Sequence, residues 1–195
     1  MPTITRDSLM SLETYARERT AFRAKVMAHK KNRQVQLGDH VTLIFEDEMT
    51  IRYQVQEMLR VERIFEETGI DDELAAYNPL VPDGSNWKAT MMIEYPDVEQ
   101  RKHMLATLKG IEKQVWVRVA GGERVYAIAD EDLERETEEK TSAVHFLRFE
   151  LTDAVKQALA TGATLAVGVD HPQYRALVDN VSPAVRTSLL QDLQL

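Results

Sequence analysis

Apolar residues recur at helical spacing in several stretches of this chain, and these stretches are its predicted helices. The first stretch contains neither Gly nor Pro, and Gly69 ends the second. Asp97, Thr152 and Ser182 are residue types that cap helix N-termini, and Pro183 suits a first helical position. The pattern predicts helices over residues 12–33, 49–67, 98–109, 153–161 and 183–192, with a short helical turn over 71–77.

Short apolar and β-branched runs, typical of strands, are concentrated in the second half of the chain. Gly121 and Gly122 separate two of these runs and predict a tight hairpin, because both glycines can take a positive φ. Residues 78–86 contain two prolines and an Asp-Gly pair, which break both regular periods and predict a loop. Strands are predicted over residues 40–46, 87–95, 115–120, 123–129, 143–151 and 165–170.

This order of elements predicts an α+β fold, because two long helices come early and about six strands cluster after them. We expect a largely antiparallel sheet with the two long N-terminal helices and further helices packed on it. The length of 195 residues fits a single domain over 1–195. Within it, residues 1–36 are assigned to the long N-terminal helix and residues 37–195 to the α+β body. No Gly-rich phosphate loop opens a helix, so no dinucleotide fingerprint or Walker motif is present.

Composition and charge narrow the chemistry. Cys is absent, which excludes disulfides, thiol nucleophiles and cysteine-ligated zinc or iron–sulfur centres within this chain. The net charge of −8 argues against a nucleic-acid partner. Residues 1–34 carry a net charge of +5 and the remainder −13, so the basic first helix either docks on the acidic body or faces a partner. The acid-rich stretch 130–139 is expected to be a solvated loop or an exposed helix.

No targeting segment is evident in the sequence. The N-terminus has no basic region followed by an apolar stretch, as a secretory signal would have. No run approaches the ~18 apolar residues of a membrane span. We therefore expect a cytoplasmic protein with no membrane contact.

One stripe of the first predicted helix mixes aromatic, apolar and cationic residues. Phe22 and Val26 mark this stripe as the inward face, yet cations share it. Either the arginine stems cover apolar neighbours with their charged groups in water, or the cations line a polar pocket or pair with buried acids. The stripe consists of Tyr15, Arg19, Phe22, Val26, His29 and Arg33.

The second predicted helix supplies an acid for such a pair. On a helical wheel Glu62 falls within the apolar face, Gln54 flanks it and Glu57 lies further round. An unpaired ionised Glu in an apolar interface costs several kcal/mol, so Glu62 is expected to pair with Arg19 or Arg33. The hypothesis is a buried Arg–Glu–His network between the first two helices, with either a structural or a catalytic role.

The loop after the short helical turn is the other candidate site, because Pro/Gly loops with aromatic edges often shape pockets. It contributes Tyr77, Asn78 and Asn86 as candidates, although a rigid connector is an equally good interpretation. The remaining histidines do not form a metal-ligand pattern. His103 is expected on a wet helix face, and His145 in the core, so neither a metal site nor a cofactor is predicted.

Four segments of the chain resemble a bacterial family known only as the domain of unknown function 3501 family. They read RxxxLGDHVTLIFE over 33–46, QxQEMLRxE over 54–62, YNPLVP over 77–82 and DHPxY over 170–174. The family has no established activity, so no catalytic residues carry over. Its members are often encoded beside rubrerythrin and a cysteine-rich iron–sulfur oxidoreductase, and the resemblance therefore implies a role in peroxide or redox metabolism.

Two main functions remain open at this point, beside a third possibility of metal binding through His, Asp and Glu alone. The first is a non-catalytic accessory or binding protein whose partner is the iron–sulfur oxidoreductase or rubrerythrin. The alternative is an enzyme or a binder of a small anionic ligand, with its pocket between the first two helices and the loop 77–87. In the alternative, Arg19 and Arg33 hold the anionic group, and Glu62 or His29 exchanges protons.

Overall fold

The structure of the protein is a computed structural model that describes residues 3–195. In this part of the chain the α-helices are α1 (Leu12–Lys30), α2 (Glu48–Glu62), α3 (Glu67–Tyr77), α4 (Val98–Thr107), α5 (Asp153–Ala160) and α6 (Pro183–Leu190). The strands are β1 (Gln34–Leu37), β2 (Val41–Glu46), β3 (Asn86–Ile93), β4 (Val115–Val119), β5 (Arg124–Tyr126), β6 (Ile128–Ala129), β7 (Val144–Glu150), β8 (Leu165–His171) and β9 (Tyr174–Val178). Short 3-10 helices are η1 (Arg6–Ser8), η2 (Asn78–Leu80) and η3 (Ile111–Gln114).

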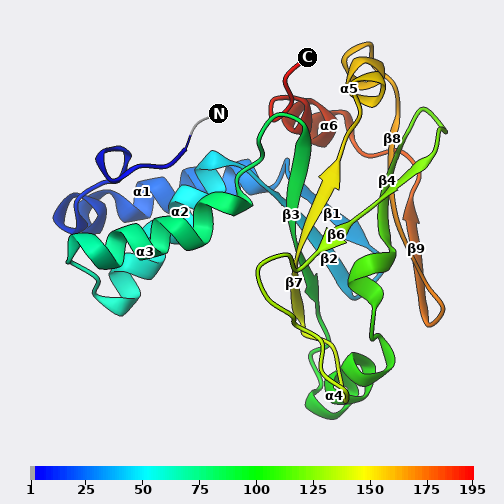
Figure 1. Cartoon of the computed structure of the whole chain (residues 1–195), viewed down its shortest axis with the longest axis horizontal. Coiled ribbons are helices and arrows are strands. Elements are labelled where there is room, and N and C mark those ends of the chain that lie inside the picture. The colour runs from blue at the N-terminus through cyan, green and yellow to red at the C-terminus, as the bar shows by residue number, and fades with distance from the viewer. Residues whose placement is uncertain (1–2) are drawn as a thin grey trace.

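The strands form two antiparallel sheets. One has the order β1-β2-β3-β7-β6 and the other β5-β4-β8-β9. Successive strands β5 and β6 belong to different sheets, so the chain crosses between the sheets there. On the opposite side, the Tyr174 hydroxyl of β9 donates to the Leu37 carbonyl of β1 at 2.6 Å. Helix α4 lies at one end of the two sheets, and α5 and α6 lie at the other (Figure 1).

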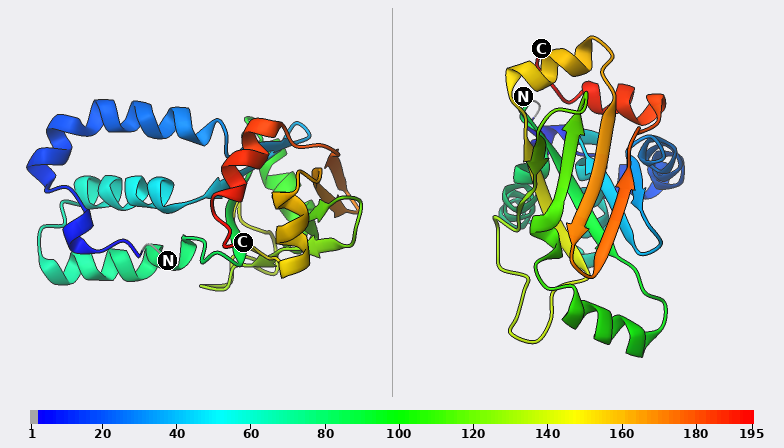
Figure 2. Two further views of the ribbon diagram at one scale, coloured as in Figure 1. Left: turned by 90° about the horizontal axis from the view of Figure 1, so that it is seen from above. Right: turned by 90° about the vertical axis from the view of Figure 1, so that its right-hand side faces the viewer.

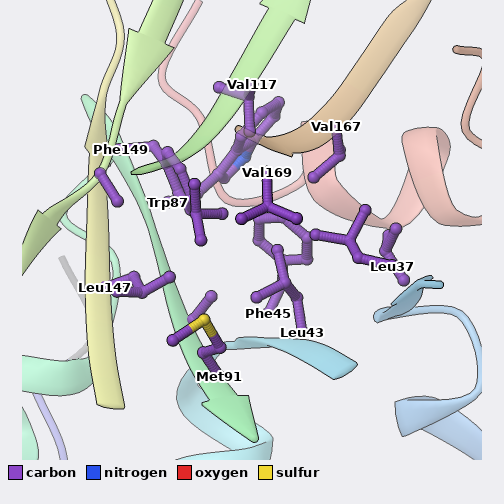
Figure 3. Packing of buried hydrophobic residues seen from close by; sticks show 14 of the residues in the cluster. Leu37, Leu43, Phe45, Trp87, Met91, Val117, Leu147, Phe149, Val167 and Val169 are labelled. Carbon is purple, nitrogen blue, oxygen red and sulfur yellow. The ribbon is translucent and has the colours of Figure 1, made fainter. Parts of the chain in front are cut away.

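The main apolar core fills the space between the two sheets. Alternate residues of each strand point inward, and the two sets of side chains meet in the middle (Figure 3). The first sheet contributes Leu43, Phe45, Trp87, Met91, Leu147 and Phe149, and the second contributes Val117, Val167 and Val169. The indole Nε1 of Trp87 also donates to the Leu189 carbonyl at 2.9 Å, which ties α6 to this core.

Helices α1, α2 and α3 form a separate helical arm that projects from one side of the sheets, with α2 between its two neighbours (Figure 2). The arm has an apolar cluster of its own, in which Ile51, Val55 and Leu59 of α2 pack with Leu74 of α3. The apolar cluster of the arm and the apolar core of the sheets are distinct. The junction between arm and sheets therefore depends on other contacts.

The α+β class and the antiparallel pairing are confirmed, and the strands divide into two sheets rather than one. The hairpin is confirmed as well, with a tight turn closed by the Gly122 N–H donating to the Val119 carbonyl at 2.9 Å. The two residues with positive φ are Ala120 (51°) and Gly121 (70°), not the two glycines. The turn thus begins one residue earlier than expected.

Three boundaries in the first half differ from the prediction because tertiary contacts override helical spacing. Helix α1 ends at Lys30, and the Arg33 carbonyl already accepts the Phe45 N–H at 2.8 Å, which starts the pairing of β1 with β2. Helix α2 ends at Glu62, where Arg63 adopts a left-handed conformation with φ 55°. The turn predicted over 71–77 is the last part of the longer helix α3.

Strands β1 and β9 are not among the predicted strands, because each is a short edge strand that pairs only with its hairpin neighbour. The expected N-terminal helix over 1–36 therefore contains most of a strand of the first sheet. None of the helices formed by residues 3–195 combines the length and the apolar character that a bilayer span needs. Met1 and Pro2 begin the segment in which a secretory signal would lie, and these two residues are outside the described part of the chain.

Candidate functional site

Arg33 lies buried at the junction of the arm and the sheets, with 1% of its surface exposed. Its Nε donates to the Phe45 carbonyl at 2.7 Å, and its Nη2 donates to the Glu46 carbonyl at 3.0 Å and to the Asp192 carboxylate. Its Nη1 lies 3.3 Å from the Ser188 carbonyl and 3.2 Å from the Ser188 hydroxyl. The guanidinium thus joins the end of α1 and the end of β2 to α6 and the C-terminal segment.

Asp47 places a second carboxylate beside Arg33. It caps α2, because its Oδ1 accepts the Thr50 N–H at 2.9 Å. Its Oδ2 lies 2.5 Å from the His29 Nε2 and 3.5 Å from the Arg33 Nη1. When the His29 ring is neutral and donates from Nε2, its Nδ1 is an acceptor, and no protein group of the described chain bonds to it.

These groups form one wall of a cavity of about 570 Å³ at the junction. His29 of α1, Asp47 before α2 and Asp192 after α6 supply its polar wall. Apolar lining comes from Met49, Val81, Pro82 and Leu193, and the remaining lining residues are Glu48, Gln191 and Gln194. The cavity is acidic and rich in acceptors, so its lining favours a ligand that brings hydrogen-bond donors or a positive charge.

The two carboxylates of the site differ in burial. The Asp192 side chain is 7% exposed and that of Asp47 is 19% exposed. Burial raises the pKa of Asp192 to about 6, although the attraction of Arg33 acts in the opposite direction. Asp192 is therefore a carboxyl group that can gain or lose a proton near neutral pH.

A second polar cluster joins α1 and α2 further along the arm. Glu57 accepts from the Tyr15 hydroxyl at 2.7 Å and from Arg19 at 2.7 and 2.9 Å. Arg60 adds a contact at 3.2 Å. The hydrogen bonds from Arg19, above all, lower the pKa of Glu57 to about 2. Tyr15 and Arg19 therefore belong to an ion-paired contact between helices, apart from the cavity.

The expectation that Glu62 is buried in an Arg–Glu–His network is wrong. Glu62 is the last residue of α2 and is exposed, and within residues 3–195 it forms no ion pair. The reason is that α2 is buried on two sides. Its apolar residues face α3, and the side that faces α1 carries Tyr53 and Glu57. The inward stripe of α1 itself is confirmed, since Tyr15 and Val26 are fully buried.

The other predicted site residues have separate positions. Gln54 and Tyr77 line a smaller cavity of about 260 Å³ between α2 and the outer face of the first sheet. Asn78 exchanges two 3.0 Å hydrogen bonds with the backbone of Ile4 and holds the N-terminal segment. Asn86 is buried, and its Oδ1 accepts the Asp83 N–H at 3.3 Å. Their binding roles stay predictions.

Sequence reasoning missed Asp47 and Asp192. Asp47 has a local signal, because Asp47 and Thr50 have the spacing of a helix cap before the apolar turn of α2. Asp192 has no local signal in the sequence, since its partner Arg33 is distant along the chain and only the fold brings the two residues together. The buried, hydrogen-bonded His145 was predicted correctly: its Nδ1 lies 2.6 Å from Asp130.

Fold and site together define a two-sheet α+β protein with a helical arm and an acidic cavity at the junction. The chain belongs to the family described as "Protein of unknown function (DUF3501)", whose profile matches residues 3–193. The resemblance noted from the sequence is thereby confirmed. The fold is also similar to the crystal structure of a novel protein of unknown function from Burkholderia pseudomallei K96243. The two chains are 58% identical with a TM-score of 0.95, over 99% of this chain and 100% of the other. A comparison with curated proteins finds no match.

The raised pKa of Asp192 makes the stability of the protein depend on pH in a defined direction. Between its usual pKa of 3.8 and the folded value of about 6, the folded state binds more protons than the unfolded state. The contribution of Asp192 to the free energy of unfolding therefore falls as the pH rises through this window. We expect Asp192→Asn to remove this fall, measured by urea unfolding from about pH 4.5 to 7.

Glu57→Gln is the matched control for that experiment, because the pKa of Glu57 shifts the other way. Its lowered pKa contributes stability above its usual value of 4.5, which is lost as the pH falls toward 2. The Gln variant should therefore lose stability at neutral pH and keep the wild-type slope above about pH 5. If the free energy of unfolding of Asp192→Asn falls with pH as steeply as that of the wild type, the raised pKa assigned to Asp192 is contradicted.

Proposed function

We propose that this protein binds a small molecule in the cavity at the junction of the arm and the sheets. The observation that carries the proposal is the convergence of His29, Asp47 and Asp192, from three separate parts of the chain, on one cavity wall. Asp47 and Asp192 also pair with Arg33, and what favours a ligand is that both, together with His29, border one cavity beside apolar residues. The proposed ligand has an apolar part and a donor group, such as an amine or amide.

The role of Arg33 in this proposal differs from that in the sequence hypothesis. All five N–H groups of Arg33 face protein acceptors, so an anionic ligand would have to displace one of them. Arg33 instead pairs with the two carboxylates and holds them in position, and the ligand binds the lone pairs that remain free on the cavity side. His29 lines the same cavity, and its Nε2 contact with Asp47 leaves Nδ1 as the ring atom that the ligand would meet.

A thermal-shift screen tests the proposal with small amines, guanidines and amides, and with carboxylates for comparison. A donor ligand at a hundred times its Kd stabilises the protein by about 2.7 kcal/mol, a rise in Tm of roughly 5–10 °C. We expect this rise in the wild type and in the control Asp179→Asn, whose side chain is 77% exposed and is not part of the cavity lining. It should be lost or strongly reduced in Asp192→Asn and in His29→Gln.

Two outcomes would count against this function. One is a ligand that stabilises all four proteins equally, since it must then bind elsewhere. The other is a screen in which only carboxylates stabilise the wild type, which would restore the anionic ligand of the sequence hypothesis.

A second candidate function is docking of a redox partner on the arm, and the exposed face of α1 favours it. Arg17, Arg23 and Lys25 of α1 and Lys31 directly after it are exposed, and within residues 3–195 none of them forms an ion pair. This basic face is complementary to an acidic partner surface. The family resemblance suggests rubrerythrin or the neighbouring iron–sulfur oxidoreductase as that partner.

Co-purification with each purified candidate partner tests the docking function. Retention is expected at about 50 mM salt and should be lost near 0.5 M, because exposed charges are screened. The double variant Arg23→Glu/Lys25→Glu should abolish retention, whereas Lys140→Glu, at an exposed position on the body, should not. Absence of retention at low salt with both partners would refute this candidate.

A further inference from the structure

A second acidic cavity lies on the body, away from the junction. Its volume is about 330 Å³, and it is lined by Glu112 and Lys113 of η3 and by residues 129–136, which begin at the last residue of β6. Six acids and two bases line it. The stretch 130–139 is largely exposed and has no regular structure after Asp130, as expected of a solvated loop, but one side of it encloses this cavity.

Glu112 is the unusual residue of this cavity. It is 2% exposed, and its Oε2 is buried without a hydrogen-bond partner. Its Oε1 has only a 3.8 Å contact with Lys113, whose side chain is 69% exposed. The Oε2 of Glu136, which also lines the cavity, is likewise buried and without a partner. A buried ionised carboxylate is costly unless a cation or donors reach it, so both groups call for a positive partner.

Three other acids of the cavity already have partners on neighbouring side chains. Asp132 pairs with Arg135 at 2.5 and 2.7 Å, and Glu131 pairs with Arg148 at 2.8 Å. Asp130 lies 2.6 Å from the His145 ring. Glu134 is exposed to solvent, so Glu112 and Glu136 are the carboxylates with a buried oxygen that is left for a ligand.

The spacing of the acids argues for an organic cation. Among residues 3–195, no three His, Cys, Asp or Glu side chains converge as the ligands of a metal ion do. Separated carboxylates suit a chain with separated ammonium groups, and Ala129 and Leu133 offer apolar contact for the methylenes between them. We propose that this cavity binds a linear aliphatic polyamine, whose ammonium groups pair with Glu112 and Glu136. The inference is independent of the junction cavity.

Calorimetric titration with spermidine at about 0.15 M salt tests the proposal, because this salt screens diffuse surface attraction. Glu112→Gln keeps the shape of the side chain and removes its charge. We expect it to bind spermidine at least about tenfold more weakly than the wild type. Glu123→Gln changes the net charge equally at an exposed position outside the cavity and should bind as the wild type does. Glu136→Gln should weaken binding as well, and it provides the test if Glu112→Gln fails to fold.

A second readout separates a ligand site from a merely buried acid. Without ligand, Glu112→Gln should unfold at the same temperature as the wild type or higher, because it removes a desolvated charge. Added spermidine should raise the Tm of the wild type and of Glu123→Gln only. Three results would each overturn the proposal: no binding to the wild type, equal binding by Glu112→Gln and Glu123→Gln, or displacement of spermidine by Mg²⁺ at equal charge concentration.

Discussion

The structure depends on one buried cation. The arm and the sheets have separate apolar clusters, so packing of apolar side chains does not by itself fix the junction. Arg33 does so with donors to β2, to α6 and to the segment after α6. Burial of a guanidinium is costly, and full pairing with carbonyls and carboxylates is what makes it tolerable. Lys could not replace it, because an ammonium lacks the planar fork that reaches all of these acceptors.

The hydrogen bonds and ion pairs of Arg33 act as a clamp between the arm and the sheets, and the candidate cavity is a consequence of this clamp. Asp47 and Asp192 lie on either side of the same guanidinium, and each also faces the cavity. Their positions therefore depend on Arg33, which the ligand need not touch. For the same reason Arg33→Ala would be a poor probe of binding, since it disturbs the fold and the site together. Substitution of His29 changes the cavity wall without removing a partner of Arg33, whereas Asp192→Asn also removes the charge that faces Arg33.

Local patterns in the sequence predicted the parts of the fold that local forces determine. The helix caps at Asp97, Thr152 and Ser182 and the hairpin near Gly121 are in place. Short strands such as β1 and β9 were not predicted, because pairing with other strands stabilises them and a short alternating run carries little signal.

The site was harder to predict than the fold. The stripe predicted for the first helix correctly placed His29 and Arg33 on its inward side. For α2, the prediction assumed a single buried face, and the helical wheel therefore selected Glu62. A helix that lies between two neighbouring helices has two buried faces, and Glu57 is the acid on the face of α2 that contacts α1. Asp192 could not be found at all, since its pairing with Arg33 joins the two ends of the chain.

Amide hydrogen exchange of Arg33→Lys tests the clamp most directly. If Arg33 joins the arm to the sheets, the segments 45–50 and 188–193 should lose protection together, by at least about tenfold. Strands β4 and β8 of the second sheet should keep wild-type protection, and Arg19→Lys should affect neither segment. Unchanged protection at 45–50 and 188–193, or an equal loss in all strands, would contradict the account.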